Sequence, residues 1–157
     1  MVSLIVAHDE ARGIGKDNAI PWDFPEDLQF FKLATTTNPS GSKKNALVMG
    51  TRTWESLSRR PLPGRKNVVV SRSSGVSLKE TLETLKANAE VARIFVIGGG
   101  EIYRQCLEEK LVDYLYVTHI PGTFDCDVVF PAYEEGFTCL FRKDMGDRLH
   151  RTVWVRK

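Results

Sequence analysis

The fold class is decided by one stretch of the chain, Ile94-Phe95-Val96-Ile97-Gly98-Gly99-Gly100-Glu101-Ile102-Tyr103-Arg104. Its first four residues are apolar and rich in β-branched side chains, which is typical of a strand buried on both faces. Three glycines follow, and a helical pattern begins directly after them. A buried strand that turns into a helix indicates a parallel sheet covered by helices.

The same alternation extends in both directions along the chain. Short Val- and Ile-rich runs predict strands at 2–7, 46–49, 67–70, 93–97 and 111–120, and helical patterns fall at 25–35, 52–57, 77–88 and 101–108. This order predicts an α/β doubly wound, mostly parallel sheet. Residues 137–141 and 150–155 are strand-like with no helix between them, so we expect an antiparallel C-terminal hairpin at one edge.

Length and composition limit the function. The chain has 157 residues, 42% of them apolar and 27% charged, which fits one domain over 1–157. The net charge, 22 − 20 = +2, is too even for a protein whose main partner is a nucleic acid or an anionic membrane. No apolar run approaches the ~18 residues of a membrane span. The cysteines, Cys106, Cys126 and Cys139, lack zinc spacing, so we expect no metal and a reduced, cytoplasmic protein.

Ligands of open parallel sheets bind at the carboxyl ends of the strands, where the glycines Gly98-Gly99-Gly100 lie. Glycines let a ligand approach the backbone, and the start of a helix offers free N–H groups to a phosphate. The stretch is therefore either a diphosphate cradle or only a permissive turn. It matches neither GxGxxG nor a Walker loop.

Basic residues gather in one segment. Between Thr51 and Arg72 there are six basic residues and one acid, Glu55. Arg52 and Arg72 each follow a predicted strand, and Ser71-Arg72 stands where a site for NAD commonly has a carboxylate. A hydroxyl and a guanidinium suit a 2′-phosphate, so a nicotinamide cofactor here is expected to be NADPH.

Asp27 is unusual because it lies in an apolar helix stripe. At 100° per residue it points between Phe31 and Ala34, and Asp23 with Glu26 predicts a capping box at the helix start. An unpaired buried carboxylate is costly, so Asp27 is either partnered within the protein, neutral, or set to meet a ligand.

Upstream of this helix, the long connection at 11–22 is either a lid that closes over a ligand or a static loop.

Taken together, these motifs resemble dihydrofolate reductase over nearly the whole chain. The matching stretches are Ser3-Leu4-Ile5-Val6-Ala7, Gly13-Ile14-Gly15, Asn18-Ala19-Ile20-Pro21-Trp22, Pro25-Glu26-Asp27-Leu28, Phe31-Lys32, Val48-Met49-Gly50, Thr53-Trp54-Glu55-Ser56, Arg60-Pro61-Leu62-Pro63-Gly64-Arg65-Lys66-Asn67, Ile97-Gly98-Gly99-Gly100-Glu101-Ile102-Tyr103 and Tyr116-Val117-Thr118-His119-Ile120. Their number, order and spacing are specific for the family.

The resemblance implies NADPH-dependent reduction of 7,8-dihydrofolate to tetrahydrofolate in one-carbon metabolism. It also implies a monomer, inhibition by antifolates and a cis peptide between Gly98 and Gly99. Catalytic roles are implied for Asp27, Trp22, Tyr103 and Thr118. Substrate contacts are implied for Ile5, Ala7, Asp27, Leu28, Phe31, Leu57, Leu62, Arg65, Ile97 and Thr118, with Arg65 on the glutamate carboxylate. Cofactor contacts are implied for Ala7, Ile14, Gly15, Ile20, Gly50, Arg52, Thr53, Ser71, Arg72, Ile97, Gly98, Gly99, Gly100, Glu101 and Ile102.

Two other functions fit part of the pattern. A reductase of another heterocycle, such as the pyrimidine reductase of riboflavin synthesis, shares the fold, but Asp27 and Arg65 argue against it. A non-catalytic dinucleotide-binding module needs only the glycines and the basic strand ends.

The polar stretch 35–45 is expected to be one surface loop, and His8, His119 and His150 are expected to be structural.

Overall fold

The computed structural model describes residues 1–157 and contains one seven-stranded sheet in the order β4-β3-β5-β1-β6-β9-β8, with a separate two-stranded sheet, β2-β7. Its elements, in chain order, are β1 (Val2–His8), β2 (Gly13–Gly15), α1 (Pro25–Thr36), β3 (Lys44–Gly50), α2 (Thr51–Ser56), β4 (Lys66–Val70), the 3-10 turn η1 (Arg72–Ser74), α3 (Leu78–Ala87), β5 (Val91–Gly98), α4 (Gly100–Glu108), β6 (Tyr114–His119), β7 (Val128–Val129), β8 (Phe137–Gly146) and β9 (Leu149–Arg156).

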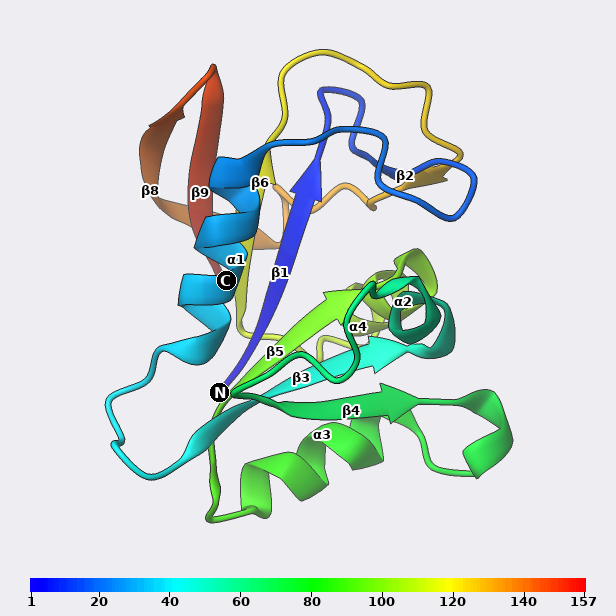
Figure 1. Ribbon diagram of the computed structural model, residues 1–157, viewed down its shortest axis with the longest axis vertical. Coiled ribbons are helices and arrows are strands. Elements are labelled where there is room, and N and C mark those ends of the chain that lie inside the picture. Colours follow the sequence, from blue (N-terminus) through cyan, green and yellow to red (C-terminus); the bar gives the residue numbers. More distant parts are fainter.

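Strands β4, β3, β5, β1 and β6 are parallel, whereas β9 pairs antiparallel with β6 and with β8 (Figure 1). The α/β class, the mostly parallel sheet and the antiparallel C-terminal edge are therefore confirmed. Val, Ile and Leu fill the central strands because both sheet faces are covered.

Each sheet face has its own apolar cluster. The smaller one, which we call the front cluster, contains Ile5, Leu47, Met49 and Phe95 and packs against residues of α1 and of the α2 segment. The larger one, the back core, joins the opposite side of the same strands to α3 and α4. Since α1 follows β1 and α4 follows β5, the chain leaves these two neighbouring strands towards opposite faces, as expected of a doubly wound sheet.

The prediction of one surface loop over 35–45 is wrong at both ends of that range. Thr35 belongs to α1 and Asn45 to β3, and both are fully buried. The Asn45 amide donates to the carbonyls of Thr35 (2.9 Å) and Thr37 (3.0 Å), and its oxygen accepts the Arg93 N–H (3.1 Å). Polar composition misled the prediction because these groups bond within the protein instead of to water.

The predicted capping box is also wrong. The residue before α1 is Phe24, in extended conformation, and no side chain caps the helix. Pro25 occupies the first turn as expected, but this places exposed Asp23 one residue too early to cap it. Glu26 does not reach back either, since its Oε2 atom is buried without a hydrogen-bond partner.

None of the helices has the length and apolar character needed to cross a membrane.

Candidate functional site

A crevice opens where β1 and β5 separate. β1 pairs with β5 only at Val2, Ser3 and Leu4, whereas it pairs with β6 from Ser3 as far as His8. The carboxyl half of β1 therefore has no ladder on its β5 side. Because α1 and α4 leave towards opposite faces, this gap is the topological switch point at which doubly wound sheets bind ligands.

Tyr103 of α4 bridges this crevice. Its hydroxyl donates a hydrogen bond of 2.7 Å to the carbonyl of Ile5, the first residue of β1 beyond the β5 ladder. Burial raises the pKa of Tyr103, and the nearby Cys106 and Asp27 raise it further. The hydroxyl therefore keeps its proton and acts as a fixed donor in this structure.

Glycines line the β5 side of the crevice. The Gly98–Gly99 peptide is cis, as the resemblance implies, and Gly98 has φ +125°, a conformation that other residues rarely adopt. A Cβ on Gly98 would lie 3.3 Å from the Tyr103 hydroxyl, and one on Gly50 would lie 3.2 Å from Ile102. No side chain caps the start of α4, so its first N–H groups stay open to an anion.

Asp27 lies on the front side, on α1. It is half-buried, and burial raises the pKa of its carboxyl, whereas a hydrogen bond with the Thr118 side chain lowers it. Asp27 forms no ion pair. Thr118 is therefore a polar partner of Asp27 within the protein, and no cationic side chain pairs with the carboxylate.

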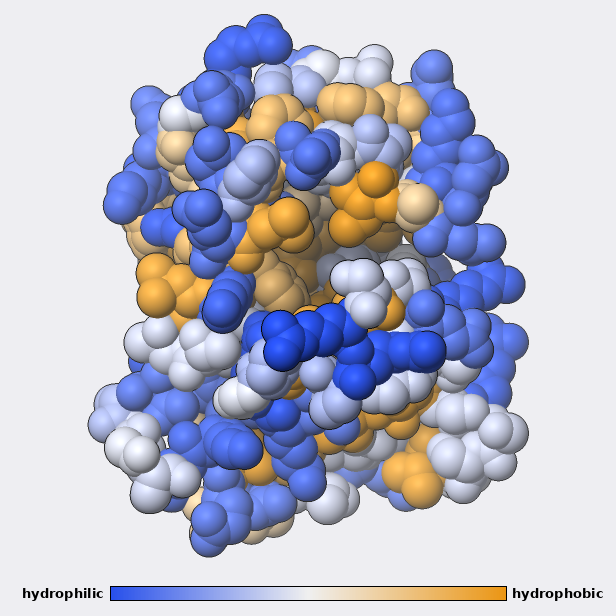
Figure 2. All heavy atoms as spheres, in the orientation of Figure 1, coloured by the Kyte–Doolittle hydropathy of each residue, from blue (hydrophilic) through white to orange (hydrophobic).

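Most of the predicted apolar wall residues come together around the front cluster. Phe31, Leu57, Leu62 and Ile97 are partly buried against it, and Ile5 belongs to it. Leu28 differs, because it is 63% exposed. On the face drawn in Figure 2, apolar side chains gather in the middle of the molecule and the surface is hollowed there, between the α1 side and the α2 side.

Arg65 is held near the far end of α1. It is buried, and its Nη1 donates to the Thr35 hydroxyl (2.9 Å) while Nε donates to the Pro63 carbonyl (3.0 Å). Thr35 in turn donates to the Phe31 carbonyl (2.7 Å). Nη2 has no partner in the chain, so one edge of the guanidinium remains free for a carboxylate. Sequence reasoning missed Thr35, although its place four residues after Phe31 puts it on the Asp27 side of α1.

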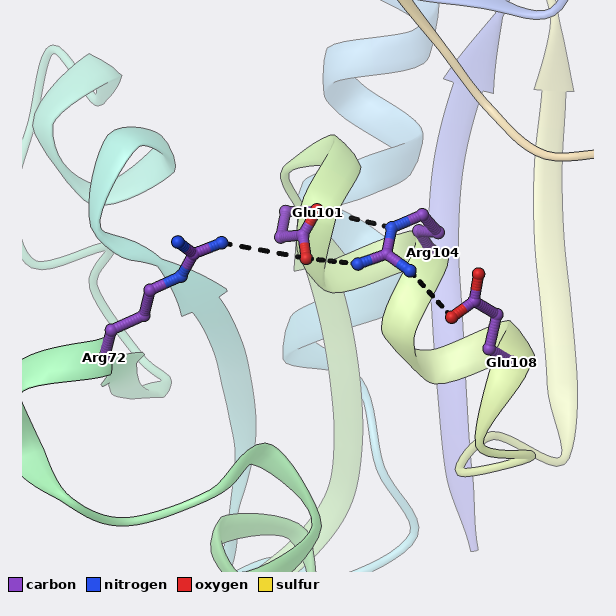
Figure 3. A network of polar contacts seen from close by, with 4 residues as sticks. All are labelled: Arg72, Glu101, Arg104 and Glu108. Atoms are coloured by element: carbon purple, nitrogen blue, oxygen red, sulfur yellow. Dashed lines mark hydrogen bonds and ion pairs between the residues drawn. The ribbon is translucent and has the colours of Figure 1, made fainter.

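The basic strand ends lie beside α4. Arg72 is 91% exposed, and its Nη2 lies 3.8 Å from the Glu101 carboxylate. Glu101 is also bonded to Arg104, which donates to Glu108 at 2.7 Å (Figure 3). Arg104 holds the pKa of Glu101 below its ordinary value, so the carboxylate is charged. Exposed pairs of this kind are weak, which leaves Arg72 available to another anion.

The connection at 11–22 is fixed at its base. β2 pairs with β7, and the Asp9 carboxylate accepts the N–H groups of Ala11 (2.9 Å), Gly13 (2.7 Å) and Phe124 (2.9 Å). Burial acts to raise the pKa of Asp9, but these hydrogen bonds bring it below its ordinary value. Sequence reasoning missed Asp9, because nothing in the sequence pairs it with Phe124.

Further along this connection, the chain reverses at Asp17-Asn18, both with positive φ, and Ile20 is 62% exposed. Trp22 packs edge-on against Phe124, with 5.3 Å between ring centroids. The base of the connection is therefore anchored and its tip is exposed, and closure of the tip over a ligand stays a prediction.

The structure thus defines an α/β protein with a glycine-lined crevice and an acidic group in an apolar wall. The family model described as dihydrofolate reductase matches residues 1–153. The chain is 41% identical to dihydrofolate reductase type 3 of Salmonella typhimurium over 85% of this chain and 80% of that protein. It is 39% identical to a putative dihydrofolate reductase of Caenorhabditis elegans, over 81% of this chain and 75% of that protein.

It is also 40% identical to bifunctional dihydrofolate reductase-thymidylate synthase 1 of Arabidopsis thaliana, over 83% of this chain. The chain matches only 28% of the length of that bifunctional relative. The chain belongs to the dihydrofolate reductase family.

Proposed function

We propose that this protein reduces 7,8-dihydrofolate to 5,6,7,8-tetrahydrofolate with NADPH, and so supports one-carbon metabolism. The observation that carries the proposal is Asp27: a half-buried carboxylate beside the front cluster, with Thr118 as its polar partner and no ion pair. A pteridine ring offers an exocyclic amine and a ring nitrogen side by side, which match the two oxygens of one carboxylate.

Features of the crevice support NADPH as the cofactor. At Gly50, Gly98 and Gly99 a Cβ would lie within 3.5 Å of a neighbouring side-chain atom, so a larger residue would displace the side chains that shape this wall. Ser71 and exposed Arg72 at the end of β4 are suited to hold a 2′-phosphate, which only NADPH carries. When bound, NADPH supplies the hydride. The glycine wall and Ile14 would hold the nicotinamide side by side with the substrate ring, and such positioning is worth roughly 7–11 kcal/mol.

The other half of the reaction is a proton on the substrate's ring nitrogen. The raised pKa of Asp27 increases the fraction of protonated carboxyl at neutral pH. The proton comes from Asp27 itself or from a water held near Trp22 and Thr118. Tyr103, whose hydroxyl is committed to Ile5, contributes by fixing the crevice beside the nicotinamide. Arg65 would pair with the substrate's glutamate carboxylate through its free edge.

We further propose that the protein acts as a monomer in the cytoplasm and is inhibited by antifolates, which offer the same amine and ring nitrogen to Asp27.

The direct test is the fall in absorbance at 340 nm when dihydrofolate is added to the protein with NADPH. We expect turnover by the native sequence and a loss of about 10²- to 10⁴-fold in Asp27→Asn at pH 7. Asp23→Asn, an exposed carboxylate just before α1, is the matched control and should keep the native rate. Cofactor binding without turnover would favour the non-catalytic module, and turnover of a pyrimidine substrate alone would favour the related reductase.

A further inference from the structure

A second cavity lies on the opposite sheet face from Asp27, and the same two strands build it. Successive side chains of a strand point to opposite faces. On β6, Thr118 reaches Asp27 whereas His119 packs against His8 and His150 behind the sheet. On β1, Ile5 belongs to the front cluster, whereas His8 packs on Phe130 and Tyr133 of the back side.

This cavity encloses about 690 Å³, a volume typical of small-molecule sites. We call it the histidine cavity. It is lined by His8, Asp9, Glu10, Ala11, Arg12, His119, Ile120, Pro121, Tyr133, Glu134, Arg148 and His150. None of these residues is among those proposed to bind folate or NADPH.

Part of the lining is satisfied within the protein and forms a fixed wall. His8 Nδ1 lies 2.8 Å from the Asp9 carbonyl, which only accepts, so Nδ1 carries the hydrogen. His8 Nε2 therefore accepts from the Tyr133 hydroxyl at 2.9 Å. The Asp9 carboxylate is held by three backbone N–H groups. These groups have no N–H or O–H left to donate to an anion.

Several other polar atoms of the lining lack hydrogen-bond partners. The Arg12 Nε atom is buried and makes no hydrogen bond, and neither Arg12 nor Arg148 forms an ion pair. His150 makes no side-chain hydrogen bond, and His119 bonds only through Nε2, to Thr152 at 2.7 Å. The two imidazoles are stacked with centroids 4.2 Å apart and planes 5° apart, so their edges lie side by side.

Unpartnered guanidinium and imidazole N–H groups around one hollow match the oxygens of an anion. Two carboxylates of the lining, Glu10 and Glu134, are exposed and pair with neither arginine. A cation is a poor candidate, because the structure contains no group of three His, Cys, Asp or Glu side chains arranged to hold a metal.

We propose that the histidine cavity is a second binding site, which takes a small-molecule oxyanion, a phosphate or a carboxylate, between Arg12, Arg148, His119 and His150. This site needs neither folate nor NADPH, so it stands whether or not the proposed reductase activity does.

Proton uptake accompanies binding. Burial lowers the pKa of His119 to about 3 and also lowers that of His150, so both imidazoles are neutral at pH 7. A bound anion favours their charged forms and raises both pKa values. Binding should therefore raise the pKa values of His119 and His150 and favour proton uptake at the site. The other charged or titratable groups that act on these two histidines are His8, Arg142 and Asp144.

The experiment follows the imidazole Cε1–H signals of His119 and His150 by NMR in the full chain. Inorganic phosphate and citrate are each titrated against sodium chloride of equal ionic strength, at pH 6 and pH 7.5. Binding of either anion at the basic end of β4 does not interfere, because neither histidine lies there. We expect saturable shifts with at least one anion, and an increase in both histidine pKa values.

The replacement residues are chosen to suit the backbone conformation at each position. Arg12 and Arg148 have φ of 60° and 63°, which asparagine adopts readily, so Arg12→Asn with Arg148→Asn removes both guanidinium groups. We expect affinity to fall roughly tenfold or more. If the double variant does not fold, Arg148→Asn alone in the exposed hairpin turn carries the test. Arg59→Asn removes an exposed arginine outside the cavity and should change nothing.

Saturation by phosphate alone identifies a phosphate ligand, and saturation by citrate alone identifies a carboxylate. The proposal is overturned if neither anion shifts the two histidines beyond the effect of chloride. Shifts that persist unchanged in the folded arginine variants, or that Arg59→Asn weakens equally, would also overturn it.

Discussion

The Tyr103 hydroxyl and the Ile5 carbonyl are joined by a 2.7 Å hydrogen bond across the place where β1 and β5 part. Ile5 is the first residue of β1 without a partner on β5, so the phenol takes the place of a strand neighbour. This bond sets the width of the crevice in which we place the nicotinamide.

Tyr103→Phe tests this bond. Removing the hydroxyl leaves a buried carbonyl without a donor, and we expect a loss of about 1–3 kcal/mol in the free energy of unfolding, measured with urea. We also expect a higher KM for NADPH, because the wall of its site is less fixed. Tyr114→Phe is the control, since the Tyr114 hydroxyl makes no hydrogen bond in the chain. Equal losses in the two variants would contradict the assignment.

Asp27→Asn should increase stability while it removes activity. The pKa of Asp27 is raised in the folded chain, so the favourable contribution of its protonated form is lost as the pH rises through that value. At pH 7 the folded protein carries a poorly solvated charge that asparagine lacks. The gain in unfolding free energy should therefore be larger at pH 7 than at pH 4, and each kcal/mol corresponds to about 2–4 °C in Tm. A less stable variant at pH 7 would refute this account.

The pH dependence of the remaining activity of Asp27→Asn is a separate prediction. Without the carboxyl, the ring nitrogen must receive its proton from solvent, so the rate should recover in part as the pH falls and the substrate is protonated beforehand. Rates of Asp27→Asn and the native sequence are compared from pH 5 to pH 8. Native-like rates at neutral pH would remove Asp27 from the mechanism.

Arg72→Ala should discriminate between the two nicotinamide cofactors. Only NADPH carries the 2′-phosphate, so we expect its KM to rise about tenfold while that for NADH changes little. Arg59→Ala, also exposed, makes the same change in net charge and controls for it. Equal increases for both cofactors would refute the 2′-phosphate assignment.

Arg65→Ala should raise the KM for dihydrofolate more than that for NADPH, because the proposed partner of Arg65 is the substrate's carboxylate. Thr35→Val removes the hydroxyl that holds the guanidinium and should produce a smaller change in the same direction. If Thr35→Val alters only stability, the hydroxyl has no part in orienting Arg65.

The histidine cavity makes stability sensitive to acid. Burial lowers the pKa of His8, His119 and His150 below 6.5, and that of His119 reaches about 3. Between pH 6.5 and these values the unfolded chain takes up protons that the folded chain does not, so stability falls as the pH drops. In urea unfolding between pH 6.5 and pH 5, His119→Gln should lessen this slope. An unchanged slope would show that His119 does not contribute to it.

Local patterns predicted the elements well because each buried strand and amphipathic helix carries its own signal. The position of Asp27 on the apolar side of α1 followed from helical spacing alone. The crevice did not, because it depends on β1 leaving β5 at Leu4 while staying with β6, a register set by distant parts of the chain.

Buried polar groups were the main source of error. Thr35, Asn45 and Asp9 have the composition of a surface, but each finds a partner on a distant segment of the chain. The histidines were expected to be structural. His8 fits that description, and His119 and His150 line the cavity for which we propose a ligand.

The short β1–β5 ladder has a mechanical consequence. Val2, Ser3 and Leu4 make the only strand pairings between the β4-β3-β5 part of the sheet and the β1-β6-β9-β8 part, and they all lie at one end. Beyond Leu4 the two parts of the sheet diverge, and a molecule bound between them touches both. A ligand in the crevice would bridge the two parts beyond the last strand pairing, where the Tyr103–Ile5 hydrogen bond already spans them.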